Sequence, residues 1–163
     1  MEDSSLNQQP QQPQQSQQPQ TLEEYFYAKQ EYWNGVVHDL FKRMKSINEL
    51  LELQPIAYSC RQMAVDSYYY MLNLLDAQKR IYNITYANEY NKLKTTAQIR
   101  YTTEAAINAQ IAANMSDIIY KTALMSNHTK YMLDTIKSID NVIFGIKDHI
   151  ELLKIRESAQ FNG

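Results

Sequence analysis

The stretch Met132–Leu153, MLDTIKSIDNVIFGIKDHIELL, carries the pattern that decides the fold. Its apolar residues recur at alternating spacings of four and three residues: Met132, Ile136, Ile139, Ile143, Ile146, Ile150 and Leu153. A sustained 3.5-residue period is typical of a helix that presents one apolar seam to partner helices. We therefore expect this seam to be a homo-oligomer interface. Isoleucine at both seam positions disfavours a simple parallel dimer and favours a higher-order assembly.

The same repeat extends toward the N-terminus, where it becomes more polar. Its earlier positions are Ile111, Met115, Ile118, Thr122, Met125 and Thr129. The pattern predicts a helix over about 98–156, which would be roughly 90 Å long at 1.5 Å per residue. Such a helix either breaks near Ser126 and Asn127 or finds partner chains. The alternative is that the seam packs only against other helices of its own chain, as in a monomeric bundle.

A capping box marks the beginning of an earlier helix. Thr21 can cap the amide of Glu24, and the Glu24 side chain can reach back to the amide of Thr21. Apolar residues continue on one face from Phe26 through Trp33 and Leu40. The sequence predicts a helix over about 22–53 that stops before Pro55, because proline lacks a backbone donor.

A further helix is predicted over about 57–92. Its apolar side consists of Cys60, Met63, Tyr70, Leu74, Ala77, Ile81 and Ile84. The segment Arg80–Tyr86 is rich in β-branched and aromatic residues, so a strand there is an alternative.

The composition favours one mainly α domain of long helices. The chain has 163 residues with only three glycines and four prolines, which argues against an all-β fold. Residues 1–20 hold three of the prolines and many glutamines, so we expect a disordered tail, followed by a single helical domain over 21–163. The net charge is −2, so binding of a polyanion would need local basic clusters.

Neither a catalytic apparatus nor a metal site is expected from the sequence. The three glycines form no phosphate-binding loop, and His38, His128 and His149 are too far apart to follow metal-ligand spacing. We expect each of these histidines at the surface or on the flank of a helix. We also expect no catalytic residue, no cofactor and no enzymatic activity. The single cysteine, Cys60, fits a buried thiol in a reducing compartment. We expect a cytoplasmic protein, in the host cytoplasm if phage-encoded, without a membrane span.

One segment, 77–101, combines basic and aromatic residues. It contains Lys79, Arg80, Lys92, Lys94 and Arg100 against a single acidic residue. Tyr82, Tyr86 and Tyr90 recur every four residues and would form an aromatic ladder on a helix. Cations beside aromatic faces suit single-stranded DNA, because phosphates attract the cations and bases can stack on tyrosine. The alternative is that the tyrosines only pack.

The string Asp76–Arg80, DAQKR, resembles an element of the UvsY recombination mediators of T-even-type phages. In the C-terminal half, Ile136–Ser138 and Ile146–Ile150 are similar to the Ile-Lys-Ser and Ile-Lys-His-Ile elements of that family.

The resemblance implies a mainly helical, ring-like homo-oligomer that is not an enzyme. It further implies binding of single-stranded DNA and help in loading a RecA-like recombinase onto strands coated by single-strand-binding protein. Lys79 and Arg80 match basic positions of the family string. Ile84 and Tyr86 stand where the family has further basic residues, so any DNA contact would depend more on tyrosine. The competing interpretation is a structural coiled-coil or scaffold protein, such as a virion component.

Overall fold

The computed structural model describes residues 21–46, 49–95 and 103–161. Four helices and no strand occur in these ranges: α1 (Leu22–Arg43), α2 (Leu50–Thr95), α3 (Glu104–Asn114) and α4 (Ser116–Phe161). The predicted mainly α fold is therefore confirmed, and Arg80–Tyr86 is helical rather than a strand. The expected tail over 1–20 lies outside the described residues.

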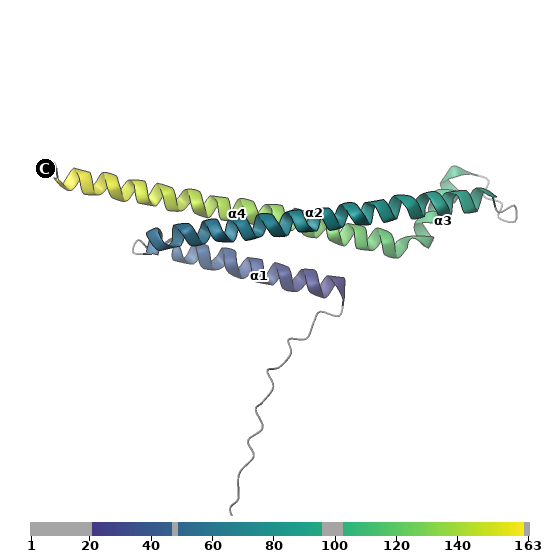
Figure 1. Cartoon of the computed structure of the whole chain (residues 1–163), viewed down its shortest axis with the longest axis horizontal. Helices are drawn as coiled ribbons and strands as arrows, with labels where there is room; N and C mark the ends of the chain where they lie inside the picture. Colours follow the sequence, from purple (N-terminus) through teal and green to yellow (C-terminus); the bar gives the residue numbers. More distant parts are fainter. Residues whose placement is uncertain (1–20, 47–48, 96–102, 162–163) are drawn as a thin grey trace, which may run out of the picture.

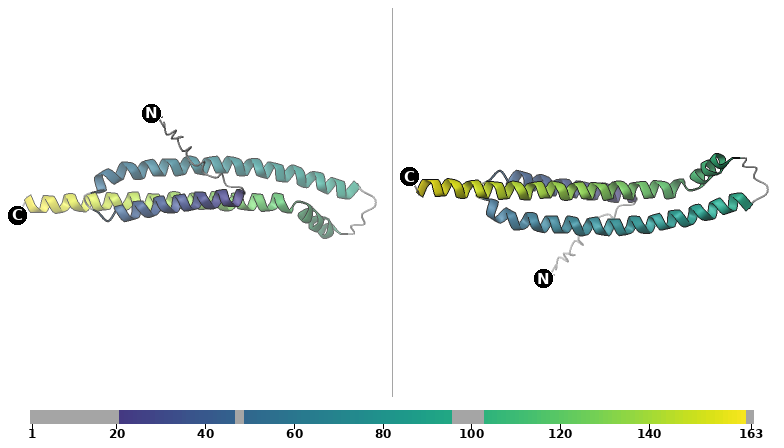
Figure 2. Two further views of the ribbon diagram at one scale, coloured as in Figure 1. Left: turned by 90° about the horizontal axis from the view of Figure 1, so that it is seen from below. Right: turned by 90° about the horizontal axis from the view of Figure 1, so that it is seen from above.

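The helices form an elongated bundle in which α2 and α4 run antiparallel along most of the molecule (Figure 1). The shorter α1 packs at one end of this pair, and α3 lies at the other end (Figure 1). Figure 2 shows that α1 and α4 lie together on one side, while α2 alone forms the opposite side. Among the described helices, none combines the length and the apolar character needed to cross a membrane.

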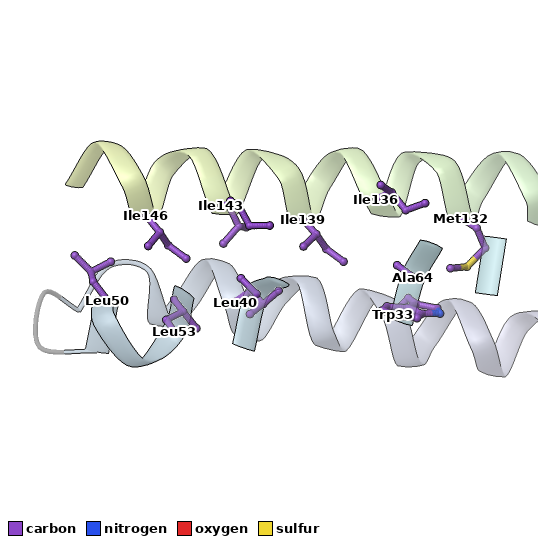
Figure 3. Packing of buried hydrophobic residues seen from close by; sticks show 12 residues of the cluster. Trp33, Leu40, Leu50, Leu53, Ala64, Met132, Ile136, Ile139, Ile143 and Ile146 are labelled. Atoms are coloured by element: carbon purple, nitrogen blue, oxygen red, sulfur yellow. The ribbon is translucent and has the colours of Figure 1, made fainter. Parts of the chain in front are cut away.

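The main core lies where α4 meets α1 and α2. Figure 3 shows isoleucines of α4 pointing toward Trp33 and Leu40 of α1 and toward Leu50 and Leu53 of α2. The buried residues of this cluster are Trp33, Leu40, Leu50, Leu53, Ala57, Ala64, Met132, Ile136, Ile139, Val142, Ile143 and Ile146. Their burial provides the main stabilisation of the bundle, since apolar area removed from water contributes about 25 cal/mol per Å².

The seam that the sequence offered as an oligomer interface is thus occupied within one chain. Met132, Ile136, Ile139, Ile143 and Ile146 are buried against α1 and α2. The remaining two seam residues, Ile150 and Leu153, are partly buried against the same cluster. The seam therefore packs within its own chain, as the alternative interpretation held. Self-association remains an expectation, and it must involve another surface or the end of α4.

The predicted apolar side of the second helix is mostly exposed, in contrast to the buried seam of α4. Met63, Tyr70, Leu74, Ile81 and Ile84 are all exposed on α2. The core instead receives a different face of α2 that includes Leu53, Ala57, Ala64, Met71 and Leu75. One helix therefore has two apolar faces, of which its own chain covers only one.

The capping box at the beginning of α1 is confirmed. The Thr21 amide donates to Glu24 Oε2 at 3.0 Å, and the Glu24 amide donates to Thr21 Oγ1 at 3.2 Å. Farther along, the Tyr131 hydroxyl of α4 lies 2.9 Å from the Gln30 carbonyl oxygen and 2.9 Å from Asn34 Oδ1. These contacts fix α1 against α4.

The predicted helix over 22–53 is wrong at its C-terminal end, because α1 ends at Arg43 and α2 begins at Leu50. The turn is closed by Arg43 Nε, which donates to Glu49 Oε2 at 3.0 Å. Reversing the chain here brings both Leu50 and Leu53 into the core. Pro55 is accommodated in the second turn of α2, where its missing donor costs one hydrogen bond.

Gly145 of α4 allows the turn after α1 to approach closely. A Cβ atom at this position would lie 2.7 Å from the Met44 sulfur. The absence of a side chain therefore leaves room for Met44, which caps α1.

The described part of the predicted helix over 98–156 is two helices, and the alternative of a break near 126 is wrong. The chain bends at Met115, between α3 and α4, and α4 continues through Ser126 and Asn127 without interruption. Thr122 and Thr129 lie within α4 without interrupting it, and their hydroxyls donate to the carbonyl oxygens four residues earlier, at 2.7 and 2.8 Å.

His128 is buried rather than at the surface. Its side chain is 3% exposed and stacks on Phe26 with ring centroids 4.4 Å apart. Nδ1 has no hydrogen-bond partner in the described structure. Burial, and then the nearby charge of Lys29, lower the pKa of His128.

We predict that Ile139→Ala lowers the free energy of unfolding by about 2–5 kcal/mol, because it leaves a cavity at a fully buried site. Urea unfolding followed by the fluorescence of the single tryptophan, Trp33, measures this change. Leu152→Ala on the same helix removes a side chain that is 62% exposed and should change the value by less than about 0.5 kcal/mol. Equal losses in the two variants would contradict the described core.

Acidification should destabilise the fold through His128. Because the folded state lowers the pKa of this imidazole, the unfolded chain binds more protons below about pH 6.5, and stability falls as the pH decreases. His128→Phe should flatten the dependence of the unfolding midpoint on pH between about pH 7 and 5. His38→Gln, at an exposed position of α1, serves as the control. A His128→Phe profile as steep as that of the parent would exclude this origin.

Candidate nucleic-acid interface

The described candidate residues all lie on the second half of α2, beyond the reach of the main core. They are Lys79, Arg80, Tyr82, Tyr86, Tyr90, Lys92 and Lys94. Arg100 lies outside the described residues. This half of α2 faces α3 and the beginning of α4 (Figure 1).

The tyrosine ladder forms as the sequence predicts. The ring centroids of Tyr82 and Tyr86 are 6.2 Å apart with an interplanar angle of 27°, and those of Tyr86 and Tyr90 are 6.2 Å apart with an angle of 18°. Four-residue spacing on a helix brings the rings onto one face, where they stack on each other.

This ladder supports α3. The three rings pack against a second buried cluster consisting of Leu93, Ile107, Ile111 and Met115. The Tyr86 hydroxyl lies 2.8 Å from Asn108 Oδ1, and the Tyr90 hydroxyl lies 3.0 Å from Glu104 Oε1. Tyr86 and Tyr90 are therefore engaged in packing, as the alternative interpretation held. For Tyr82, the described structure gives no hydroxyl hydrogen bond.

The basic side chains surround this segment of α2 and are exposed. Lys79 Nζ lies 3.8 Å from Asp76 Oδ1, and Lys92 Nζ lies 3.5 Å from Glu89 Oε1. Ion pairs this exposed contribute little, because water and salt screen them. Such side chains can exchange these partners for phosphate at little cost.

The other two basic residues, Lys94 and Arg80, have different surroundings from Lys79 and Lys92. Lys94 Nζ lies 4.6 Å from the centroid of the Tyr90 ring, within cation–π range. In the described part of the chain, Arg80 has no carboxylate within ion-pair distance.

A groove between α2 and α4 lies beside Lys79. It has a volume of about 580 Å³. Its lining consists of Lys79, Tyr82 and Asn83 from α2, and Ile119, Thr122, Ala123 and Ser126 from α4. The groove thus brings together a cation, an aromatic ring, an amide and an apolar wall. These are the groups that can hold a phosphate and an adjoining flat base.

The sequence indicated Lys79 and Tyr82 but not the groove, because the α4 residues come from forty positions farther along the chain. Thr122 was the one signal from α4, since it interrupts the apolar repeat there. Among the described residues, no group of three or more His, Cys, Asp or Glu side chains could hold a metal ion.

Comparisons of the chain with protein-family models, with curated proteins and with solved structures gave no match.

The ladder predicts a local effect of substitution. Tyr86→Ala removes the central ring and the bond to Asn108, so we expect the amides of α3 to exchange hydrogen at least tenfold faster. The amides of α4 around Ile139, in the other buried cluster, should be unaffected. Hydrogen–deuterium exchange by mass spectrometry tests both regions at once. Unchanged protection of α3 would show that the ladder does not hold this helix.

Proposed function

We propose that this chain is a non-catalytic, single-stranded-DNA-binding protein that acts as a recombination mediator and helps load a RecA-like recombinase. The observation that carries the DNA-binding part is the groove at Lys79, where Tyr82 and Asn83 lie next to an exposed cation. The resemblance of Asp76–Arg80 to the mediator string falls on the same turn of helix.

In the proposed binding mode, phosphates contact the cations of α2 and one base enters the groove. Lys79 takes the phosphate at the rim. Tyr82 and the Ala123 side of the groove hold the base between them, and Asn83 offers an amide to the edge of the base. Lys92 and Lys94 extend the positive path toward the C-terminal end of α2.

The described part of this segment contributes four basic residues against Glu89 on a chain whose total charge is −2. Contacts this few give weak binding per copy. Several copies on one strand would raise the apparent affinity, because linked sites act at a high effective concentration. Self-association is therefore part of the proposal, as are a RecA-like recombinase and a single-strand-binding protein as partners in the cytoplasm.

The second candidate function is a structural or scaffold role. The observation that favours it is the exposed apolar side of α2, which suits assembly without requiring DNA. A scaffold would show no salt-dependent affinity for oligonucleotides, so the binding experiment separates the two.

We predict that Lys79→Glu weakens binding to a labelled single-stranded oligonucleotide at least tenfold in fluorescence anisotropy. It should also reduce the magnitude of the salt slope by at least about 0.7, the value expected for one lost phosphate contact. Lys130→Glu makes the same charge change at an exposed position outside the groove and should change affinity less than threefold. Equal weakening in both variants would indicate a general field effect, and no binding by the parent protein would favour the scaffold.

A further inference from the structure

The exposed side of α2 continues as a regular heptad seam over about eight turns of the helix. Its positions alternate at spacings of four and three residues: Ile56, Cys60, Met63, Ser67, Tyr70, Leu74, Ala77, Ile81 and Ile84. The six large apolar side chains are between 37% (Leu74) and 63% (Ile84) exposed. Apolar heptads sustained over this length are typical of a coiled coil. Apart from Cys60, which packs partly against the main core, this seam has no helix covering its full length among the described residues.

The neighbouring elements leave this seam open. The helix α1 reaches along α2 only to the level of Tyr70 and Met71, where Tyr25 and Lys29 line a shared cavity. Figure 2 shows that α1 runs along only part of α2, and no other described helix lies over the side of α2 away from α4. Leu74, Ile81 and Ile84 lie on this uncovered half.

From this placement we infer that α2 binds α2 of a second copy of the chain, antiparallel and across a two-fold axis near Asn73. In that register Leu74 of one copy lies opposite Tyr70 of the other, and Ile81 lies opposite Met63. The open C-terminal half of the seam in each copy thereby covers the N-terminal half, which borders α1, in the other copy. Such a self-complementary contact is the usual form of a dimer interface.

The charges beside the seam select this orientation. One residue flanks each repeat on the side opposite to the positions of Ala57 and Ala64: Ser59, Asp66, Asn73, Arg80 and Ala87. Of these, Asp66 also lines the cavity that α2 shares with α1. Asp66 and Arg80 lie seven residues to either side of Asn73. Antiparallel pairing about Asn73 therefore places Asp66 of each copy beside Arg80 of the other, which forms two ion pairs.

A parallel pair would lose these contacts. In a parallel coiled coil, a flanking residue meets the position five residues later in the partner. Asp66 would then face Met71, and Arg80 would face Thr85. Both charges would be left without an opposite charge, whereas the antiparallel register satisfies both.

The inference rests on α2 alone and not on the proposed DNA binding. Lys79→Glu, which should impair DNA binding, is expected to leave the mass of the particle unchanged. Conversely, a monomeric parent chain that still binds oligonucleotides would overturn this inference and the self-association in the proposed function, but not the proposed DNA binding.

Sedimentation velocity on the full chain should give a dimer, or a multiple of two, at micromolar concentration. Leu74→Glu/Ile81→Glu should give a monomer of unchanged helical content, since both side chains are exposed within one chain. Phe144→Glu is the control, because this apolar residue is also exposed, on α4, but lies off the seam, and the variant should stay dimeric. A monomeric parent, an odd-numbered ring, or a dimeric double variant would overturn the inference.

A charge exchange tests the register independently of folding. Asp66→Arg alone and Arg80→Asp alone should each weaken dimerisation at least tenfold, because each places like charges together. The combined variant should restore the parent affinity. In a Cys60→Ala background, Asn73→Cys should form a disulfide-linked dimer, whereas Ser59→Cys should not. Failure of the combined variant to restore dimerisation, or crosslinking through Ser59→Cys, would overturn the antiparallel register.

Discussion

The antiparallel contact between α2 and α4 is the interaction on which the remaining structure depends. It places two alanines of α2, Ala57 and Ala64, against the isoleucines of α4. Small residues on one helix let the other approach closely, so branched side chains fill the space at the density of a protein interior. Arg61 and Asp140 add an ion pair between these helices at 2.6 Å. Both side chains are partly exposed, so the apolar contact and not this pair provides most of the stability.

Much of the fold could be predicted from local patterns. The α content, the capping box at Thr21 and the period of Met132–Leu153 are each properties of a few neighbouring residues. The ends of the helices were harder to predict. Ser46 and Asn48 are turn-forming residues, but Pro55 was the stronger signal and indicated the wrong boundary. Asn114 and Ser116 likewise suit a helix end and a helix start, but the continuous apolar repeat obscured the bend between them.

The assignment of the apolar faces needed three-dimensional information. Both α2 and α4 carry a seam with a 3.5-residue period, and a period alone does not say which partner a seam meets. The structure pairs the α4 seam with the alanine-containing face of α2 and leaves most of the α2 seam exposed. At the candidate site, too, the sequence pattern does not identify the packing partners. The tyrosine spacing predicted a ladder, but only the position of α3 shows that Tyr86 and Tyr90 have packing partners.

The three buried residues of α1 are Phe26, Trp33 and Leu40, which stand seven residues apart and differ in size. With regular spacing alone, α1 could shift by two turns along its neighbouring helices and still bury an apolar residue at most of the same sites. The order of sizes forbids this. A slip would place the indole of Trp33 where the ring of Phe26 stacks on His128, and would leave Leu40 in the larger pocket of Trp33. The order of side-chain volumes along α1 therefore selects one register of this helix against its neighbours.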